Sequence, residues 1–354
     1  MKPFLAAVLA GLVLAGCSAE PGSVEASDGQ EQSWSIAQAT IFPADRGLQR
    51  AEDGVQLDDG TLIVADQRHG LVKVASDGTF EPFGNFAAVG FGQEPAGVVP
   101  GPNGVHLEPD GKRVVVADVF TGRIYRTNIE AGTTELVYAH PFGANTAITD
   151  STGAVWFTQS TENQGEERLF VAVDKAMDDG AVYRLSAAED GQLVSEPELV
   201  VDGLNFANGF YLDEASGKFY LSETMANRVL VFTLDVAAGT LSDRKVLAEV
   251  PSPDNMRLAP DGSLWVASPA SNQVIAIDTD TGTTRVVFDA QTEAGAKSVQ
   301  EWLRRSAAGE SAADLLNPEV QGEMPGVLTG IIIGREDQPF YVSNLGNALV
   351  KVER

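Results

Sequence analysis

The sequence is short of the residues that carry most metal, redox and nucleophilic chemistry. Its 354 residues include one cysteine and three histidines, so no cluster of Cys and His ligands at zinc spacing is present. It also lacks the Gly-x-Ser-x-Gly motif of serine hydrolases and the glycine-rich loop that binds phosphate. Nucleophilic serine chemistry and nucleotide use are therefore unsupported.

Basic residues are also scarce, with 24 Lys and Arg against 50 Asp and Glu, which gives a net charge of −26. Such a surface repels nucleic-acid backbones and anionic lipid headgroups, so we expect no nucleic-acid partner. The charge favours solubility and identifies no substrate.

No apolar run in the sequence is long enough to span a bilayer. The run from Phe4 to Ala15 is too short, and no other stretch is long or apolar enough. This run is typical of an export signal, and Leu14-Ala15-Gly16-Cys17 resembles the bacterial lipoprotein processing box. The resemblance implies that Cys17 is lipidated, which leaves no thiol for a disulfide or for catalysis. Ser18 then implies anchoring at the periplasmic face of the outer membrane. An ordinary signal peptide with an incidental cysteine is the alternative.

Three segments follow from this pattern. Residues 1–17 are expected to be the lipoprotein signal peptide, and residues 18–33 lack apolar periodicity, which is typical of a flexible tether. Residues 34–354 are expected to form one domain. The membrane is expected to be contacted through the lipid anchor only.

A repeat made of a strand, an Asp/Gly turn and a second strand occurs six times along that domain. The turns centre on Gly60, Gly111, Gly153, Gly217, Gly262 and Gln338. Counting back eight residues, or nine for the longer turn at Gly217, gives Glu52, Asn103, Asn145, Asn208, Asp254 and Gly330. If each repeat forms one blade of a closed array, these residues converge on one axis.

The strand pairs, such as Thr61–Ala65 with Leu71–Val74, fit four-stranded blades. The sequence therefore predicts an all-β, six-bladed β-propeller. The leading strand Ser35–Phe42 precedes the first full blade, and we expect it to complete the last one.

Two segments break the repeat. Residues 159–179 expand a connection in the third blade, and residues 291–317 predict a short helical insertion between blades five and six. Val299, Trp302, Leu303 and Ala307 share one face of that helix, which suggests a lid at the propeller mouth or packing on the outer rim.

Strand direction predicts which loops share a face with the converging residues. Those are the connections 67–70, 119–122, 159–179, 223–227, 269–272 and 344–347. We expect substrate contacts here, from Asn103, His69, His140, Glu223 and Thr329. His106 is expected to turn away from the axis.

Glu52, Asn145, Asn208 and Asp254 offer only oxygen ligands, which Ca²⁺ prefers, although another divalent cation would also fit. Asn255 is an additional predicted ligand, and Asp53 could add a further oxygen. Five oxygen-bearing side chains in six equivalent places exceed what turn chemistry explains, since an unpartnered buried carboxylate or amide costs several kcal/mol.

Five segments of the domain have distinctive local sequences: Phe206-Ala207-Asn208-Gly209, Ser222-Glu223-Thr224, Asn227-Arg228-Val229, Pro253-Asp254-Asn255-Met256-Arg257 and Leu264-Trp265-Val266. These segments resemble the strictosidine synthase-like propellers and the wider gluconolactonase, paraoxonase and diisopropyl-fluorophosphatase superfamily. The resemblance covers residues 40–354. It implies that the superfamily's calcium ligands correspond to Glu52, Asn145, Asn208 and Asp254, and that Asn103 is a pocket residue.

The sequence also departs from these relatives. Thr146 stands where relatives often have Asp, so a second, structural calcium is in doubt. Asn103 replaces the mouth histidine of paraoxonases, and Thr329 and Gly330 replace the glutamate of plant strictosidine synthases. Alkaloid synthesis is therefore not expected.

The sequence-based hypothesis is a calcium-dependent hydrolase of a small-molecule lactone or ester on the cell envelope. Asp254 would be the base or nucleophile and Glu52 the main anionic ligand. The alternative is a non-catalytic, metal-stabilised propeller that acts as a binding or scaffold lipoprotein.

Cys17→Ser tests the proposed anchor. We expect the variant to lose incorporated fatty acid and to leave the membrane fraction, whereas Ser18→Ala keeps the label. Both are measured by metabolic labelling and cell fractionation. Retention of the fatty acid by Cys17→Ser would contradict lipidation at this residue.

Overall fold

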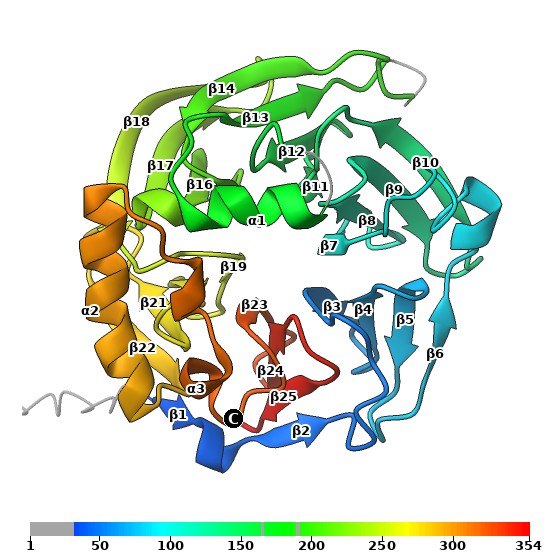
Figure 1. Ribbon diagram of the computed structural model, residues 1–354. Coiled ribbons are helices and arrows are strands. Elements are labelled where there is room, and N and C mark those ends of the chain that lie inside the picture. The colour runs from blue at the N-terminus through cyan, green and yellow to red at the C-terminus, as the bar shows by residue number, and fades with distance from the viewer. Residues whose placement is uncertain (1–31, 164–165, 189–191) are drawn as a thin grey trace, which may run out of the picture. The chain divides into compact units, whose positions relative to one another are not determined.

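The computed structural model describes residues 32–163, 166–188 and 192–354 (Figure 1). The predicted signal peptide, Cys17 and most of the tether lie outside these ranges. Residues 33–354 form one compact unit. Among the described residues, no helix has the length and apolar character needed to cross a bilayer.

Six sheets surround a central axis, which confirms the predicted six-bladed propeller (Figure 1). Blades one and two contain β3 (Gly54–Gln56), β4 (Leu62–Asp66), β5 (Gly70–Val74), β6 (Phe80–Phe83), β7 (Pro102–Leu107), β8 (Arg113–Asp118), β9 (Arg123–Asn128) and β10 (Thr134–Ala139). Blades three and four contain β11 (Ala147–Thr149), β12 (Val155–Gln159), β13 (Gly180–Leu185), β14 (Glu198–Leu204), β15 (Ala207–Asp213), β16 (Lys218–Glu223), β17 (Arg228–Asp235) and β18 (Thr240–Glu249). Blades five and six contain β19 (Met256–Leu258), β20 (Leu264–Ser268), β21 (Gln273–Ile277), β22 (Thr284–Asp289), β23 (Leu328–Ile332), β24 (Phe340–Asn344) and β25 (Leu349–Val352).

The N-terminal part of the domain closes the ring, as predicted. The strand β2 (Thr40–Phe42) pairs antiparallel with β25 and completes blade six. The preceding strand β1 (Trp34–Ser35) pairs in parallel with β22 of blade five. One short segment therefore links the first part of the domain to its last two blades.

The core lies between adjacent blades, because both faces of the second strands are covered. All residues of β4, β12 and β20 are buried. In one such layer, Ile63 and Ala65 of blade one pack with Val114 and Val116 of blade two. This layered packing holds the inner strands β3, β7, β11, β15, β19 and β23 around the axis.

Buried polar residues at the ends of the second strands fix the loops on the mouth side. The Asp118 carboxylate accepts hydrogen bonds from the Gly101, Phe120 and Thr121 amides at 2.9–3.0 Å. Asp66 and Glu223 occupy the equivalent position in their blades and accept hydrogen bonds from the Gln49 and Asn205 amides, both at 2.8 Å. These acids anchor the chain segments that lead into β3, β7 and β15.

The predicted insertion between blades five and six is helical. It contains α2 (Glu293–Ala308), a 3-10 turn η4 (Ala313–Leu315) and α3 (Pro318–Gln321). Thr292 caps α2 by accepting a hydrogen bond from the Gly295 amide at 2.9 Å. The buried Trp302 donates its indole N–H to Asn227 Oδ1 at 2.7 Å.

The expanded connection in blade three contains a helix that the sequence analysis did not predict, α1 (Glu166–Asp174). Figure 1 shows α1 across the inner part of the propeller, on the viewer's side of the blades. Leu169 and Ala172 of α1 pack in one apolar cluster with Trp302 and Ala312 of the later insertion. Figure 1 shows α2 itself at the outer rim of the propeller. The apolar cluster joins α1 to the later insertion, and we call α1 together with residues 312–316 the mouth cap.

The remaining short helices lie between strands. They are η1 (Ile36–Gln38), η2 (Phe86–Val89) and η3 (Thr224–Ala226).

Phe42→Ala tests the closing strand. Phe42 is 8% exposed, and the centroids of the Phe42 and Tyr341 rings lie 5.5 Å apart. We expect the variant to lose about 3 kcal/mol of unfolding free energy, the usual cost of removing a buried Phe side chain. Thr40→Ala, at an exposed position of the same strand, should change it little. Urea unfolding measures both, and equal losses would contradict the role of Phe42.

Candidate functional site

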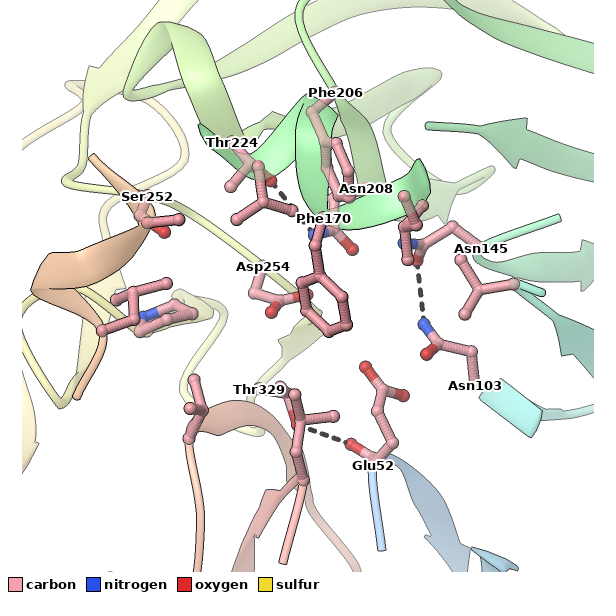
Figure 2. A pocket seen from close by; sticks show the side chains of 18 of the residues that line it. Glu52, Asn103, Asn145, Phe170, Phe206, Asn208, Thr224, Ser252, Asp254 and Thr329 are labelled. Atoms are coloured by element: carbon pink, nitrogen blue, oxygen red, sulfur yellow. Dashed lines mark hydrogen bonds between the residues drawn. The ribbon is translucent and has the colours of Figure 1, made fainter. Parts of the chain in front are cut away.

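The side chains predicted to converge meet in one cavity of about 250 Å³ at the propeller mouth (Figure 2). Its lining comprises Arg50, Glu52, Asn103, Val119, Asn145, Leu169, Phe170, Val173, Phe206, Asn208, Thr224, Ser252, Asp254, Pro269, Ala313, Leu316, Val327, Thr329 and Leu345. Five of the six converging positions contribute a side chain. We call these five the ring residues: Glu52, Asn103, Asn145, Asn208 and Asp254. In blade six the wall residue is Thr329, one position before the predicted Gly330.

Irregularities in the inner strands help to direct these side chains. The pairing register shifts between Pro102 and Val105, between Ala207 and Phe210, and between Leu328 and Gly330. Such bulges turn a side chain away from the regular alternation of a strand. Asn103, Asn208 and Thr329 lie within these three shifts, and all three line the cavity.

Two Asn-Gly pairs, which resemble turn sequences, lie in inner strands because the backbones approach closely there. A Cβ atom at Gly209 would lie 2.6 Å from the Asn255 Cα, and one at Gly104 would lie 2.9 Å from the Thr146 Cα. Only glycine leaves room for the next blade at these positions. The same requirement brings Asn103 and Asn208 to the axis.

A second set of cavity residues stands two positions before the ring residues. Arg50, Phe206 and Ser252 precede Glu52, Asn208 and Asp254, and all three have left-handed backbone conformations with φ of 55°, 61° and 49°. This conformation costs a non-glycine residue about 1–3 kcal/mol and is concentrated at functional sites. Its repetition in three blades is consistent with a built site.

Hydrogen bonds link the ring side chains. Asn255 Nδ2 donates to Glu52 Oε1 at 2.9 Å, and Asn103 Nδ2 donates to Asn145 Oδ1 at 3.1 Å. Asn208 Nδ2 donates to Thr224 Oγ1 at 3.0 Å. Each bond fixes the orientation of an oxygen atom at the cavity.

Arg50 is the cation of this cavity wall. Its Nη1 donates to the Pro102 carbonyl and its Nη2 to Asn103 Oδ1, both at 2.9 Å. The guanidinium also lies 5.0 Å from the centroid of the Phe120 ring. These contacts hold Arg50 beside Asn103.

The two carboxyl groups are electrostatically strained. Burial raises the pKa of Glu52 well above its ordinary range, and the charge of Asp254 raises it further. Burial also raises the pKa of Asp254 to about 8, although its contact with Asn208 and the charge of Arg50 oppose this shift. The ionised pair therefore lacks sufficient positive charge around it.

The oxygen donors fit a hard divalent cation. Glu52 Oε2 and Asn208 Oδ1 are buried and accept no hydrogen bond from the described residues. With Asp254 they offer carboxylate and amide oxygens, the ligand types that Ca²⁺ takes. No group of three or more His, Cys, Asp or Glu side chains forms a metal site in the described part of the chain. The amides would therefore have to complete the coordination.

Other predicted site residues lie outside the cavity wall. His140 is 6% exposed and shares a hydrogen bond with Gln159 Oε1 at 2.8 Å, beside the Phe157 and Tyr183 rings. Glu223 is fully buried and forms an ion pair with Arg228 at 2.6 Å. His69, in the 67–70 loop, is half-buried and does not line the cavity.

Asp53 and Asn255, which follow the two acids in the sequence, also do not line the cavity. Asn255 is fully buried and contacts Glu52 without lining the cavity. Asp53 forms an ion pair with Arg257 at 2.8 Å and accepts a hydrogen bond from the Val105 amide. His106 Nε2 lies 2.9 Å from Arg257 Nη1. His106 does not line the cavity, in agreement with the prediction that it turns away from the axis.

The sequence analysis missed the set that precedes the ring residues by two positions. Arg50 and Ser252 stand at the same spacing before Glu52 and Asp254, so the shared register that found the two acids could also have found these two residues. The contribution of α1 had no comparable signal, because residues 159–179 have no counterpart in the other blades.

Comparisons with known proteins agree with this fold. Residues 139–294 match the family described as SMP-30/Gluconolactonase/LRE-like region. The chain is 25% identical over 177 residues to the adipocyte plasma membrane-associated protein of Gallus gallus, covering 48% of this chain and 41% of that protein. It is 29% identical over 196 residues to a gluconolactonase of Zymomonas mobilis, covering 51% of this chain and 52% of that protein.

A solved structure of a gluconolactonase from Xanthomonas campestris has the same fold, with a TM-score of 0.57 and 19% identity. The aligned region covers 86% of each chain. The chain is thus a six-bladed propeller that is similar to the SMP-30 and gluconolactonase group over part of its length, in agreement with the resemblance stated from its residues. The matched segments span about half or less of the curated relatives.

Asp254 allows a test that needs no substrate. Its ordinary pKa is 3.8 and its pKa in the fold is about 8, so between these values the folded state keeps a proton that the unfolded state has lost. With a chelator present to remove any bound cation, the free energy of unfolding should therefore fall as the pH rises from about 4 to about 8. Asp254→Asn should flatten the fall.

Urea unfolding at several pH values measures this dependence. Asp77→Asn, at a turn away from the cavity, is the matched control and should keep the wild-type slope. A slope in Asp254→Asn equal to that of the wild type would show that the buried pair does not govern the pH dependence.

Proposed function

We propose that this protein is a divalent-cation-dependent hydrolase of a lactone or ester, with Ca²⁺ as the expected cation. One observation carries the proposal: Glu52 and Asp254 are buried at one cavity with the amides of Asn145 and Asn208, and two of these oxygens lack hydrogen bonds from the described residues. The similarity to a protein named gluconolactonase supports the lactone class.

Glu52, Asn145, Asn208 and Asp254 would hold the cation. When bound, the cation supplies Lewis-acid polarisation of a carbonyl and positive charge that favours the ionised form of both carboxyl groups. Asn255 keeps Glu52 in place through its hydrogen bond to Oε1. Thr329 and Ser343 hold the same residue by donating hydrogen bonds to its backbone carbonyl at 2.9 and 2.7 Å.

Asp254 is the proposed general base. Its carboxylate takes a proton from water as the water oxygen bonds to the carbonyl carbon, and it then gives this proton to the leaving oxygen as the ester C–O bond breaks, which yields the acid and the alcohol. Asn103, held by Arg50, and Thr329 would position the substrate from opposite sides of Glu52 (Figure 2). A direct nucleophilic role of Asp254 is the alternative chemistry for the same residue.

We also propose that this activity is located at the cell envelope. The proposal rests on the apolar run and Cys17 in the sequence, which lie outside the described residues. The fractionation of Cys17→Ser tests it independently of catalysis.

Hydrolysis of lactones and aryl esters, measured with and without a chelator, tests the proposed activity. We expect chelation to abolish turnover and added Ca²⁺ to restore it. Asp254→Ala should lower kcat/KM by about 10²–10⁴-fold, the usual contribution of a general base. Asp77→Ala is the matched control and should retain the wild-type rate.

Two results would overturn this proposal. Hydrolysis that is indifferent to both the chelator and Asp254→Ala would exclude the mechanism. A chelator-induced drop in Tm without hydrolysis of any ester, lactone or phosphotriester would instead identify a non-catalytic, cation-stabilised propeller.

A further inference from the structure

The cavity changes character between its floor and its wall. Charged and amide side chains surround the floor, whereas the wall nearest the mouth is apolar. The mouth cap supplies five wall residues, Leu169, Phe170, Val173, Ala313 and Leu316, and none of them carries a polar side-chain group. Phe206 continues the same surface from blade four. A ligand that reaches the floor must therefore lie against an apolar wall.

This wall is held in place by its own contacts. The Asp174 carboxylate, at the end of α1, accepts hydrogen bonds from Ser311 Oγ at 2.6 Å and from the Ala312 and Ala313 amides at 3.1 and 3.0 Å. These bonds join α1 to the segment that carries Ala313 and Leu316. The two halves of the mouth cap thus present a preformed surface, which reduces the cost of ordering on binding.

Phe170 occupies a particular place in this surface. Figure 2 shows its ring pointing toward the middle of the polar residues that line the floor. Phe170 is 45% exposed although it lines the cavity. Its ring therefore offers uncovered apolar area to whatever enters.

This surface selects against hydroxyl-rich ligands. A hydroxyl group placed against Leu169, Phe170 or Leu316 would lose hydrogen bonds to water and gain none from these side chains. An alkyl or aryl group in the same position would remove apolar area from water on both sides.

We propose that the site takes a lactone or ester with an apolar alkyl or aryl substituent, in preference to a polyhydroxylated lactone, and that Phe170 is a specificity-determining residue. This inference rests on the proposed function for its reacting group. The ester carbonyl lies at the floor near Asp254, and the substituent lies along α1 and Leu316. The Zymomonas mobilis relative is named for gluconolactone, so the inference separates this chain from that substrate.

The first experiment measures kcat/KM for γ-lactones with side chains from methyl to heptyl, and for glucono-δ-lactone, with Ca²⁺ present. We expect kcat/KM to rise about fourfold per methylene group until the cavity is filled, as the burial of each group predicts. Glucono-δ-lactone should be a poorer substrate than the heptyl compound. Equal rates along the series, or a preference for glucono-δ-lactone, would overturn the inference.

The second experiment uses variants of neighbouring residues on α1. Phe170→Ala should lower kcat/KM for the heptyl lactone about tenfold and change that for the methyl lactone little. Phe170→Leu should restore most of the chain-length dependence. Val171→Ala is the matched control, since Val171 is 57% exposed and does not line the cavity. An equal loss on the short and long lactones in Phe170→Ala would contradict the specificity role.

Binding of the matching lactams separates this inference from the proposed function, because their amide bond replaces the ester. Calorimetry should show affinity that rises with chain length in the wild type and less steeply in Phe170→Ala. Such binding without hydrolysis of any lactone would reject the proposed function and support the apolar site. Hydrolysis of lactones with no chain-length dependence in lactam affinity would support the function and reject the apolar site.

Discussion

The burial of two carboxyl groups beside one cavity is the constraint on which the site depends. Glu52 and Asp254 come from blades one and five. Burial raises the pKa of both groups, and the charge of Asp254 raises the pKa of Glu52 further. A protein interior tolerates such a pair only where hydrogen bonds, a cation or retained protons offset the repulsion. Asn255 and Arg50 supply part of that compensation. The arrangement is a poor choice for stability alone, which is the physical basis for assigning it a function.

The repetition of the sequence made much of this arrangement predictable. Six turns with a common spacing predicted the blades, and the same spacing brought Glu52, Asn145, Asn208 and Asp254 to one axis. The closing strand followed from its position before the first blade. The register failed in blade six, where a bulge brings Thr329 to the wall in place of Gly330. A count of residues assumes regular strands and cannot detect such a shift.

Residues away from the converging positions were harder to place. Glu223 stands at the end of a second strand, like Asp66 and Asp118, and this shared position could have indicated a structural role in its ion pair. His140 lies among aromatic rings contributed by distant strands, which no local pattern reveals. The wall formed by α1 depends on tertiary packing against Trp302. Side-chain chemistry was therefore predictable where symmetry fixed the position, and not where an insertion did.

The left-handed backbone at Arg50, Phe206 and Ser252 has a consequence for selection. Glycine would relax the main chain at each of these positions, so a screen that rewards only resistance to heat should enrich glycine there. Each such change would also remove a side chain that lines the cavity. Heat resistance and recognition would then diverge at three sites in three different blades, and libraries built for robustness should leave these codons untouched.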